Sequence, residues 1–348
     1  MLRILLLVSL LCSSVVFAQK DAEKKYRKAG ESHMVFMDSG SVHLRPMTGD
    51  VDVPLDYLTN PGEFKVGAFY ISAYEVSNFD YLEYVYWLNR EDHENYKAAL
   101  PDTTVWEKKP YYSQAYLEYY FRHPAYRYYP VVGVTHQQAL DFCAWLTDRY
   151  NANPERKHKK VRFRLPTKTE WTYAALSGAE YQKPEKGKSL AIAYKAYNSF
   201  FPWPSEVAGG NPFSMQDEDG DWMANFRPMD QASVRYLPEA TMIYDSDTIT
   251  NNFYIGWPGH ACYHVPGSLS DCHDVTTPVY SYLPGLSGLY QMAGNVEEMV
   301  AEYGITKGGS WNDTGYYLQN TTEETYDASG ETTCFRGFRL AMDVIEEF

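Results

Sequence analysis

The sequence has no excess of positive charge, and this absence excludes one class of function. Its 348 residues include 31 Lys and Arg against 45 Asp and Glu, which gives a formal net charge of −14. Proteins that bind nucleic acid carry a basic patch or stripe that meets the phosphates, and the sequence has none. We therefore expect no nucleic-acid partner. The acidity favours solubility and, weakly, the binding of cations.

Long apolar runs are absent beyond the first 18 residues. Within that stretch, Arg3 precedes an apolar run at residues 4–11 that is too short to span a bilayer, and Ala18 fits the small-residue rule for signal cleavage. Residues 1–18 therefore predict a secretory signal peptide. We expect an exported protein, in the periplasm or associated with the outer membrane.

The new N-terminus is expected at Gln19. Lipid attachment at Cys12 is the alternative, but it requires a small residue just before the cysteine, where Leu11 stands. Residues 19–33 are charged and polar, and they predict an N-terminal tail.

Cysteine is scarce. Four cysteines remain after cleavage: Cys143, Cys262, Cys272 and Cys334. Because an exported protein meets oxidising conditions, a disulfide is allowed, and we expect one between Cys262 and Cys272, which lie close in a loop-like region. The alternatives are two unbonded cysteines, or zinc binding that also uses His264 and His273, although the spacing is not a standard zinc pattern.

The chain is rich in aromatic residues, with 45% hydrophobic residues, 16% aromatic residues and 32 tyrosines. This composition excludes general disorder. Tyrosine offers a large contact area with a polar end and is common at protein interfaces. No tandem repeat or low-complexity tract is present.

Local patterns predict strands and three helices. Residues 34–46 and 64–72 alternate as strands do, and residues 78–90 carry apolar residues at helical spacing after the N-cap residue Ser77. The range 136–150 predicts a second helix.

The second and third helices have their own start signals. Thr135 is the expected N-cap of the helix over residues 136–150, and Cys143 falls on its apolar face, so we expect a core position. Thr167 and Glu170 form a capping box for a third helix, which gives Glu170 a structural role.

Two long segments lack a regular pattern. Residues 91–130 are a tyrosine-dense insertion, and residues 178–280 are rich in Gly, Pro, Asp and aromatic residues. We interpret both as partner surfaces. On that interpretation, a chain without residues 95–128 should still fold.

The stretch GLYQMAGNVEEMV, at residues 288–300, predicts a tight bend. Gly294 and Asn295 tolerate a positive φ, and Gln291 and Glu298 could add side-chain oxygens. Calcium takes six to eight such oxygens. The alternative is a glycine turn that leads into a helix.

The motifs GLYQMAGNVEEMV, KGGSW and GFRLA resemble, in this order, the pattern GLYDMxGNVWEW…RGGSW…GFR of the formylglycine-generating (sulfatase-modifying factor) family. The upstream blocks FYISAYEVSNFDYLEYV, YPVVGVTHQQALDFCAWL and RFRLPTKTEWTYAAL are also similar to that family. The resemblance spans residues 34–348. It implies one α+β domain of the formylglycine-generating type, related to C-type lectins, with little regular secondary structure.

The resemblance also implies calcium as a structural cofactor. A first site would use Gln291 and Glu298 through side chains and Gly294 and Val296 through backbone carbonyls. A second site would use the residues that match a separate motif: Asn225, Phe226, Asp271 and His273.

The oxidising members of the family carry two cysteines after GGSW that bind copper. By motif register these positions are Asp313 and Leu318, and neither is cysteine. Cu(I) requires soft thiolate ligands. We therefore expect no copper and no catalytic residue. Trp311 is expected in the core, and Arg339 is expected to have a structural role, pairing with a buried carboxylate or capping the core.

Three pieces are similar to the gliding-motility and type IX secretion lipoproteins of Bacteroidota: the insertion at residues 91–130, ANFRPMD at 224–230 and GGSWNDTGYYLQ at 308–319. This resemblance implies a non-catalytic structural or interaction component of the cell envelope. Its partners would be envelope proteins in an oligomeric assembly. The alternative is a metal-dependent oxidoreductase that acts on exported proteins.

Overall fold

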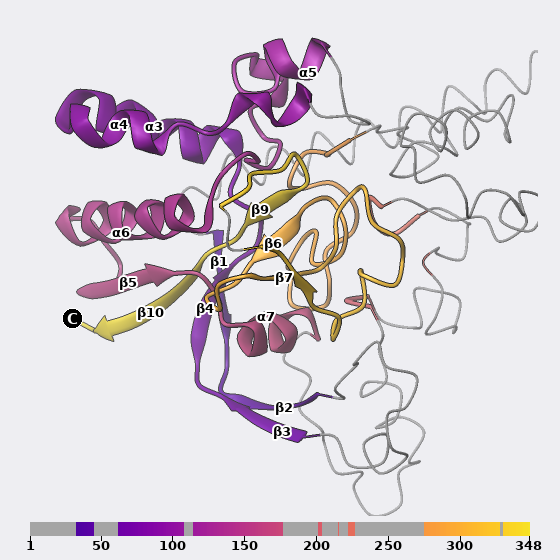
Figure 1. Cartoon of the computed structure of the whole chain (residues 1–348). Coiled ribbons are helices and arrows are strands. Elements are labelled where there is room, and N and C mark those ends of the chain that lie inside the picture. The colour runs from indigo at the N-terminus through magenta and orange to yellow at the C-terminus, as the bar shows by residue number, and fades with distance from the viewer. Residues whose placement is uncertain are drawn as a thin grey trace, which may run out of the picture.

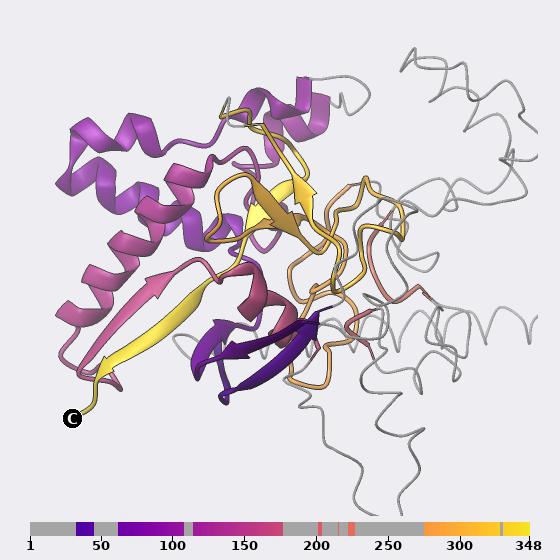
Figure 2. The ribbon, with the colours of Figure 1, turned by 60° about the horizontal axis from the view of Figure 1, so that its bottom comes forward.

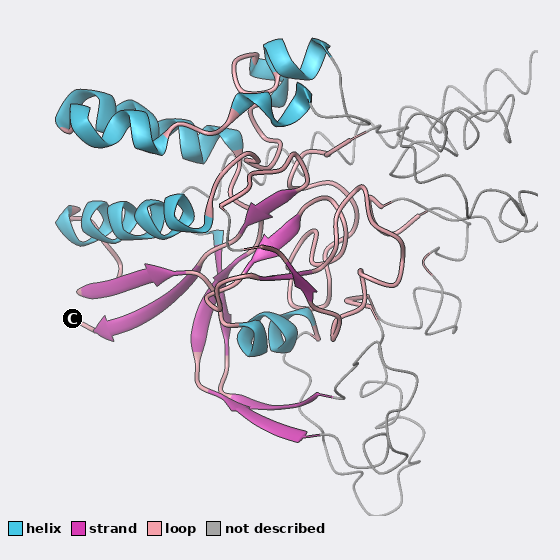
Figure 3. Ribbon diagram, viewed as in Figure 1, coloured by secondary structure: helices cyan, strands magenta, loops and turns pink. Residues whose placement is uncertain are grey.

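The computed structural model describes residues 33–44, 62–107, 114–176, 201–203, 215, 222–226, 275–327 and 330–348. Across these ranges helices and strands are mixed, and long loops surround the smaller of two four-stranded sheets (Figure 3). The α+β fold class expected from the sequence is confirmed. Among the described helices, none is both long and apolar enough to cross a membrane.

The first sheet joins the beginning and the end of the described chain. Its strands are β1 (Met34–Met37), β4 (Phe69–Ser72), β10 (Ala341–Glu346) and β5 (Lys160–Arg164), in the order β1-β4-β10-β5. Every neighbouring pair is antiparallel. The last strand of the chain therefore lies in the interior of the sheet, between β4 and β5.

The smaller sheet carries the motif that dominates the sequence. Its strands are β8 (Glu324–Thr325), β7 (Ile305–Lys307), β6 (Glu297–Met299) and β9 (Arg336–Phe338), in the order β8-β7-β6-β9. β6 and β9 are parallel, whereas the other pairs are antiparallel. A separate antiparallel pair joins β2 (Gly40–Leu44) to β3 (Gly62–Val66).

The expected strand over residues 64–72 is wrong as a single element. The range divides into β3 and β4, which belong to two different sheets, and Gly67 lies at the break between them. Glycine within a strand pattern weakens the strand and often marks a bend. The range 34–46 divides in the same way, into β1 and β2.

The three predicted helix starts are confirmed. Helix α3 (Asn78–Glu91) begins after Ser77, α6 (His136–Ala152) after Thr135 and α7 (Lys168–Ala175) after Thr167, each with a capping box. The insertion adds two short helices, α4 (His93–Ala99) and α5 (Gln114–Tyr119). It also adds two 3-10 turns, η2 (Thr103–Glu107) and η3 (Pro124–Tyr126).

The helices form layers over the first sheet. α6 lies along β5 and β10, and α3 and α4 lie outside α6 (Figures 1 and 2). A cluster of buried aromatic residues, including Tyr81, Tyr84 and Phe142, fills the space between α3 and α6. Cys143 belongs to this core, as predicted, and burial raises the pKa of its thiol to about 12.

The insertion is part of the core. Trp106 of η2 is fully buried, and its ring lies 6.5 Å from that of Trp311. Tyr120 is buried beside it and donates its hydroxyl to the Pro130 carbonyl at 2.7 Å. The interpretation of the insertion as a surface alone is therefore wrong, because a deletion of residues 95–128 would remove Val105, Trp106 and Tyr120 from a core cluster that includes Trp311.

Candidate functional site

A sharply bent loop precedes β6. Gly294 has φ +77 and Asn295 has φ +64, so the predicted bend is confirmed, and Gln291 adds φ +52. A Cβ on Gly294 would lie 2.2 Å from the carbonyl oxygen of Asn225, so only glycine fits. The Asn295 amide donates to the same carbonyl at 2.7 Å. The bend therefore holds residues of the two predicted calcium sets against each other. The segment that follows is the strand β6, so the alternative of a turn into a helix is wrong.

A buried ion pair anchors the loop. Both Glu298 and Arg339 are 0% exposed. Arg339 donates from Nε to Glu298 Oε2 and from Nη2 to Oε1, each at 2.6 Å, and Trp171 Nε1 donates to Oε2 at 2.6 Å. The predicted pairing of Arg339 with a buried carboxylate is confirmed.

Arg339 also joins three parts of the chain. It donates to the carbonyl of Ser72 at the end of β4 at 3.1 Å and to that of Tyr290 in the bent loop at 2.9 Å. Because a guanidinium has five donors in a fixed fork, this one side chain can donate hydrogen bonds to acceptors in the loop, the first sheet and β6 at the same time.

A second buried carboxylate, Glu75, faces the same loop. It is 1% exposed and accepts from Asn295 Nδ2 at 2.6 Å and from the Val296 amide at 3.3 Å. Burial raises the pKa of Glu75 well above its usual range, and the nearby Glu298 carboxylate raises it further. Sequence reasoning missed Glu75, because it lies more than 200 positions from the motif that it contacts.

Two buried amide oxygens at the same loop have no hydrogen-bond partner among the described residues. They are Oε1 of Gln291 and Oδ1 of Asn225, and both residues are buried. Gln291 is held by its Nε2, which donates to Thr277 Oγ1 at 3.0 Å, and Asn225 Nδ2 donates to the Val275 carbonyl at 2.7 Å. A buried acceptor without a donor is costly, so these oxygens call for a cation or a water.

Two residues of the first predicted calcium set carry oxygens with the chemistry that a hard cation requires. Gln291 supplies an unpartnered oxygen, and Glu298 Oε1 accepts from one donor and so keeps a lone pair. Arg339 pairs directly with Glu298 and acts on Glu75 only through its charge, so ionisation of both carboxylates would leave an excess of buried negative charge. A bound cation, or a proton on Glu75, would neutralise that excess.

The second predicted set is described only in part. Asn225 and Phe226 lie beside the bent loop, whereas Asp271 and His273 fall outside the described residues. The same is true of the signal peptide, Cys12 and the expected disulfide between Cys262 and Cys272, together with the alternative zinc ligand His264. Within the described ranges, no group of three or more His, Cys, Asp or Glu side chains is placed to hold a metal ion.

The positions that match the copper-binding cysteines have other roles. Asp313 accepts hydrogen bonds from the amide and the hydroxyl of Ser310, so its carboxylate closes the turn that follows Gly309. Leu318 is 0% exposed and packs in a cluster with Phe226. Trp311, the last residue of the GGSW motif, is buried as predicted. No thiol stands at either position.

A second buried charge pair lies at the same sheet. Arg336 Nε donates to Glu297 Oε1 at 2.7 Å, and Thr306 Oγ1 donates to Glu297 Oε2 at 2.7 Å. Burial raises the pKa of Glu297, and burial with the nearby Asp313 carboxylate raises that of Glu324 to about 8. No sequence pattern indicates this cluster beyond the acidic pair in GNVEEM.

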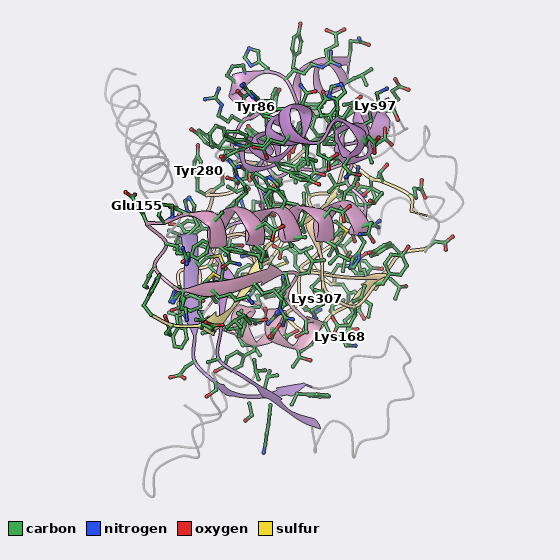
Figure 4. All side chains as sticks on the ribbon, turned by 90° about the vertical axis from the view of Figure 1, so that its left-hand side faces the viewer. Tyr86, Lys97, Glu155, Lys168, Tyr280 and Lys307 are labelled. Carbon is green, nitrogen blue, oxygen red and sulfur yellow. The ribbon has the colours of Figure 1, made fainter. Side chains whose placement is uncertain are left out.

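Lys307 is a buried lysine without an ion pair among the described residues. It is 2% exposed, and its Nζ lies 5.5 Å from the centre of the Trp171 ring. The nearby Lys168 takes Glu323 as its partner at 3.1 Å (Figure 4 labels both lysines). Burial lowers the pKa of Lys307 to about 7, although Glu323 acts in the opposite direction.

Three solved structures are similar to the chain at low identity and low TM-score. The chain is similar to a structure titled "Crystal Structure of CarF", with 17% identity, a TM-score of 0.47 and coverage of 90% of this chain and 98% of that chain. It is also similar to PvdO from Pseudomonas aeruginosa, with 17% identity, a TM-score of 0.45 and coverage of 89% and 94%. Treponema denticola variable protein 1 gives 16% identity, a TM-score of 0.44 and coverage of 88% and 94%.

No curated protein sequence matches the chain. The model of the sulfatase-modifying factor enzyme 1-like domain, by contrast, matches residues 18–344, which is most of the sequence. The bent loop, the GGSW turn and the buried arginine of GFRLA all fall within this match. The chain therefore belongs to the family of sulfatase-modifying factor enzyme 1-like (FGE-sulfatase) domains.

Proposed function

We propose that this protein is a non-catalytic interaction component of the cell envelope, built on the formylglycine-generating fold. The observation that carries the proposal is the structural role of Asp313 and Leu318, which occupy the positions of the copper-binding cysteines. The first is a carboxylate used to close a turn, and the second is an aliphatic side chain in the core. Paired thiolates bind Cu(I) and exchange with a substrate thiol, and these two side chains do neither.

The remaining cysteines of the described chain do not replace that pair. Cys143 and Cys334 are both buried, and they belong to two different core clusters. A reactive thiol needs exposure and a lowered pKa, whereas burial raises the pKa of Cys143 to about 12. This supports a scaffold role for the fold.

A copper titration of the purified chain tests the absence of catalysis. The expected result is no stoichiometric Cu(I) uptake in competition with a chelator, and no aldehyde when a cysteine-containing peptide is supplied with oxygen. Tight one-to-one copper binding, or conversion of the peptide thiol to an aldehyde, would establish the alternative, a metal-dependent oxidoreductase that acts on exported proteins.

The cellular side of the proposal follows from the sequence. The protein is exported, lies in the periplasm or at the outer membrane, and works in an oligomeric assembly with envelope proteins, as its resemblance to gliding-motility and type IX secretion lipoproteins of Bacteroidota implies. Cell fractionation followed by co-purification from native envelopes tests this. Recovery of the full-length chain, signal included, in the cytosol would contradict it.

Calcium is the cofactor in this proposal, and it stabilises the bent loop. Gln291 and Glu298 would hold it through side-chain oxygens, and Gly294 and Val296 through carbonyls. A ligand that binds only the folded state stabilises it by about 2.7 kcal/mol at 100 times its dissociation constant. The melting temperature should therefore rise with calcium and fall with a chelator.

The sharpest variant for this test is Gln291→Leu, with Gln291→Glu as its control. The leucine removes the unpartnered oxygen, so the rise with calcium should disappear, whereas glutamate keeps an oxygen and should keep the rise. Glu298 is unsuitable, because its replacement also breaks the ion pair with Arg339. An identical calcium response in the leucine variant would remove the assignment.

A further inference from the structure

Helix α3 has two apolar faces, and the fold uses only one of them. Its inward face buries Tyr81, Tyr84 and Val85 against the core. The opposite face exposes Phe79 (42% exposed), Leu82 (55%) and Tyr86 (50%), at spacings of three and four residues. Such spacing places the three side chains in one stripe, where a surface helix normally carries polar residues.

The stripe lies on the outermost layer of the molecule. α6 stands between α3 and the first sheet, and α4 lies alongside α3 (Figure 1). Figure 4 shows Tyr86 among the upper helices, well away from Lys168 and Lys307 of the motif region. The stripe is therefore a surface distinct from the bent loop and its calcium ligands.

An arginine stands at each end of the stripe. The Arg127 guanidinium lies 5.5 Å from the centre of the Phe79 ring, and that of Arg90 lies 5.3 Å from the centre of the Tyr86 ring. Arg90 Nη1 also donates to the Tyr86 hydroxyl at 2.6 Å. Neither guanidinium forms an ion pair within the described residues, although the chain as a whole carries a net charge of −14.

The two arginines set the length and the charge of a matching partner. Phe79 and Arg90 are 11 positions apart on one helix, or about 16 Å at 1.5 Å per residue. A helix packed along the stripe would present about three turns to it. Carboxylates at both ends of those turns would meet the two guanidiniums. Glu83 is exposed next to Leu82 in the helix, so its negative charge would favour a partner without a carboxylate in the middle turn.

We propose that the outer face of α3 docks an amphipathic helix of a partner protein, with apolar residues against Phe79, Leu82 and Tyr86 and carboxylates against Arg127 and Arg90. This rests on the proposed function as an interaction component, and it names the chemistry of the partner. The apolar stripe of the docking surface lies on α3, outside the two segments that the sequence analysis interprets as partner surfaces.

Two other occupants fit the stripe less well. A second copy of this chain would bring arginine against arginine: in a parallel pair each meets its own counterpart, and in an antiparallel pair Arg90 meets Arg127. An anionic membrane would meet only two cations on a strongly acidic protein, whereas polybasic membrane segments use clusters of four to eight.

A pair of labelled helical peptides tests the proposal with the full chain. The first peptide, of about 14 residues, carries a leucine stripe and glutamates at both ends, and the second has lysines in place of the glutamates. Fluorescence anisotropy should show saturable binding of the glutamate peptide, weakened by salt, and at least about tenfold weaker binding of the lysine peptide.

Charge reversal is the decisive variant. The double variant Arg90→Glu with Arg127→Glu should reverse the preference, so that it binds the lysine peptide more tightly. Leu82→Glu should lose both peptides, whereas Leu286→Glu, at an exposed leucine outside the helices, should bind as the parent does. Because the substituted side chains are exposed, each variant should melt at the same temperature as the parent, and this measurement serves as the control for folding.

Several results would overturn the docking surface. They are equal affinity for both peptides, unchanged binding by Leu82→Glu, a dimer that the charge reversal does not affect, or flotation of the parent with phosphatidylglycerol vesicles that Leu82→Glu abolishes. Failure here is separable from failure of the proposed function: a chain without peptide binding that also takes up no copper remains a non-catalytic domain, whereas copper uptake removes that function whatever the peptides do.

Discussion

The two four-stranded sheets are stabilised in different ways. The first is apolar inside, where Ile71 is 0% exposed, and its ion pairs keep some exposure: Arg162, 63% exposed, and Arg164, 23% exposed, both donate to Asp343 at 2.7 Å. The smaller sheet has the reverse arrangement. Its strands and their flanks bury Glu297, Glu298 and Lys307, each at most 3% exposed.

The comparison shows where the stability of the fold depends on single charged side chains. Apolar burial is spread over many contacts and tolerates volume-conserving change. A buried charge pair adds little net stability as a pair, yet the loss of one partner leaves an uncompensated charge in the interior. The smaller sheet should therefore fail at single charges, and the first sheet should not.

The largest effect is expected at Glu298. Glu298→Gln removes the carboxylate that Arg339 contacts directly, with Glu75 left only as a nearby group, and should cost about 3–5 kcal/mol in the free energy of unfolding. Urea denaturation measures this. The double variant Glu298→Leu with Arg339→Met should recover much of the loss, because it removes both charges. If it is no more stable than Glu298→Gln, the loss reflects packing rather than charge.

Lys307→Met should raise the free energy of unfolding, whereas Glu298→Gln should lower it. With its pKa lowered to about 7 in the folded protein, Lys307 is neutral above that pH while the unfolded chain stays protonated up to its usual pKa of 10.5. The unfolded state then binds more protons, so stability rises with pH across that window, by up to about 1.4 kcal/mol per unit.

Methionine in place of Lys307 removes this slope. The variant should be more stable than the parent at pH 6.5, and the difference should shrink toward pH 10. Urea denaturation at several pH values measures both curves. Parallel curves would mean that Lys307 is not the group responsible.

In the first sheet, Ile71→Val should cost about 1 kcal/mol, the usual effect of removing one buried methylene group. The loss should not change between pH 6 and pH 9, since no charge is involved. Thermal unfolding monitored at both pH values checks this. A loss of stability in Ile71→Val that depended strongly on pH would contradict the conclusion that the first sheet is stabilised by apolar burial and the smaller sheet by buried charges.

The smallest effect is expected for Arg162→Ala. Its side chain is 63% exposed, so its contact with Asp343 is screened by solvent and should contribute less than about 1 kcal/mol. Denaturation at low and high salt measures it, and high salt should erase the small loss. A loss that matches that of Glu298→Gln would show that surface ion pairs also hold this fold.

Short-range features of the fold were predictable from the sequence. Ser77, Thr135 and Thr167 begin their helices as predicted, because a cap depends on residues within one turn. Gly294 and Asn295 adopt the predicted positive φ, since few other residues tolerate it. The order of the motifs gave the family.

Long-range contacts were not predictable. The tyrosine-rich insertion looked like a surface, yet Tyr120 is buried because its hydroxyl finds the Pro130 carbonyl and Thr276, the latter 156 positions away. Glu75 meets Asn295 across 220 positions, and no local pattern marks either partner. The break at Gly67 was missed because alternation continues on both sides of it.

The central position of β10 has a consequence for how the molecule is made. Ala341 pairs with Ile71 on one side and with Arg164 on the other, so a strand that is synthesised after both of its neighbours holds apart two strands that do not pair with each other. A ribosome that has not yet released this segment carries a chain whose main sheet is open, and a premature stop before it leaves two bare strand edges that are prone to aggregation.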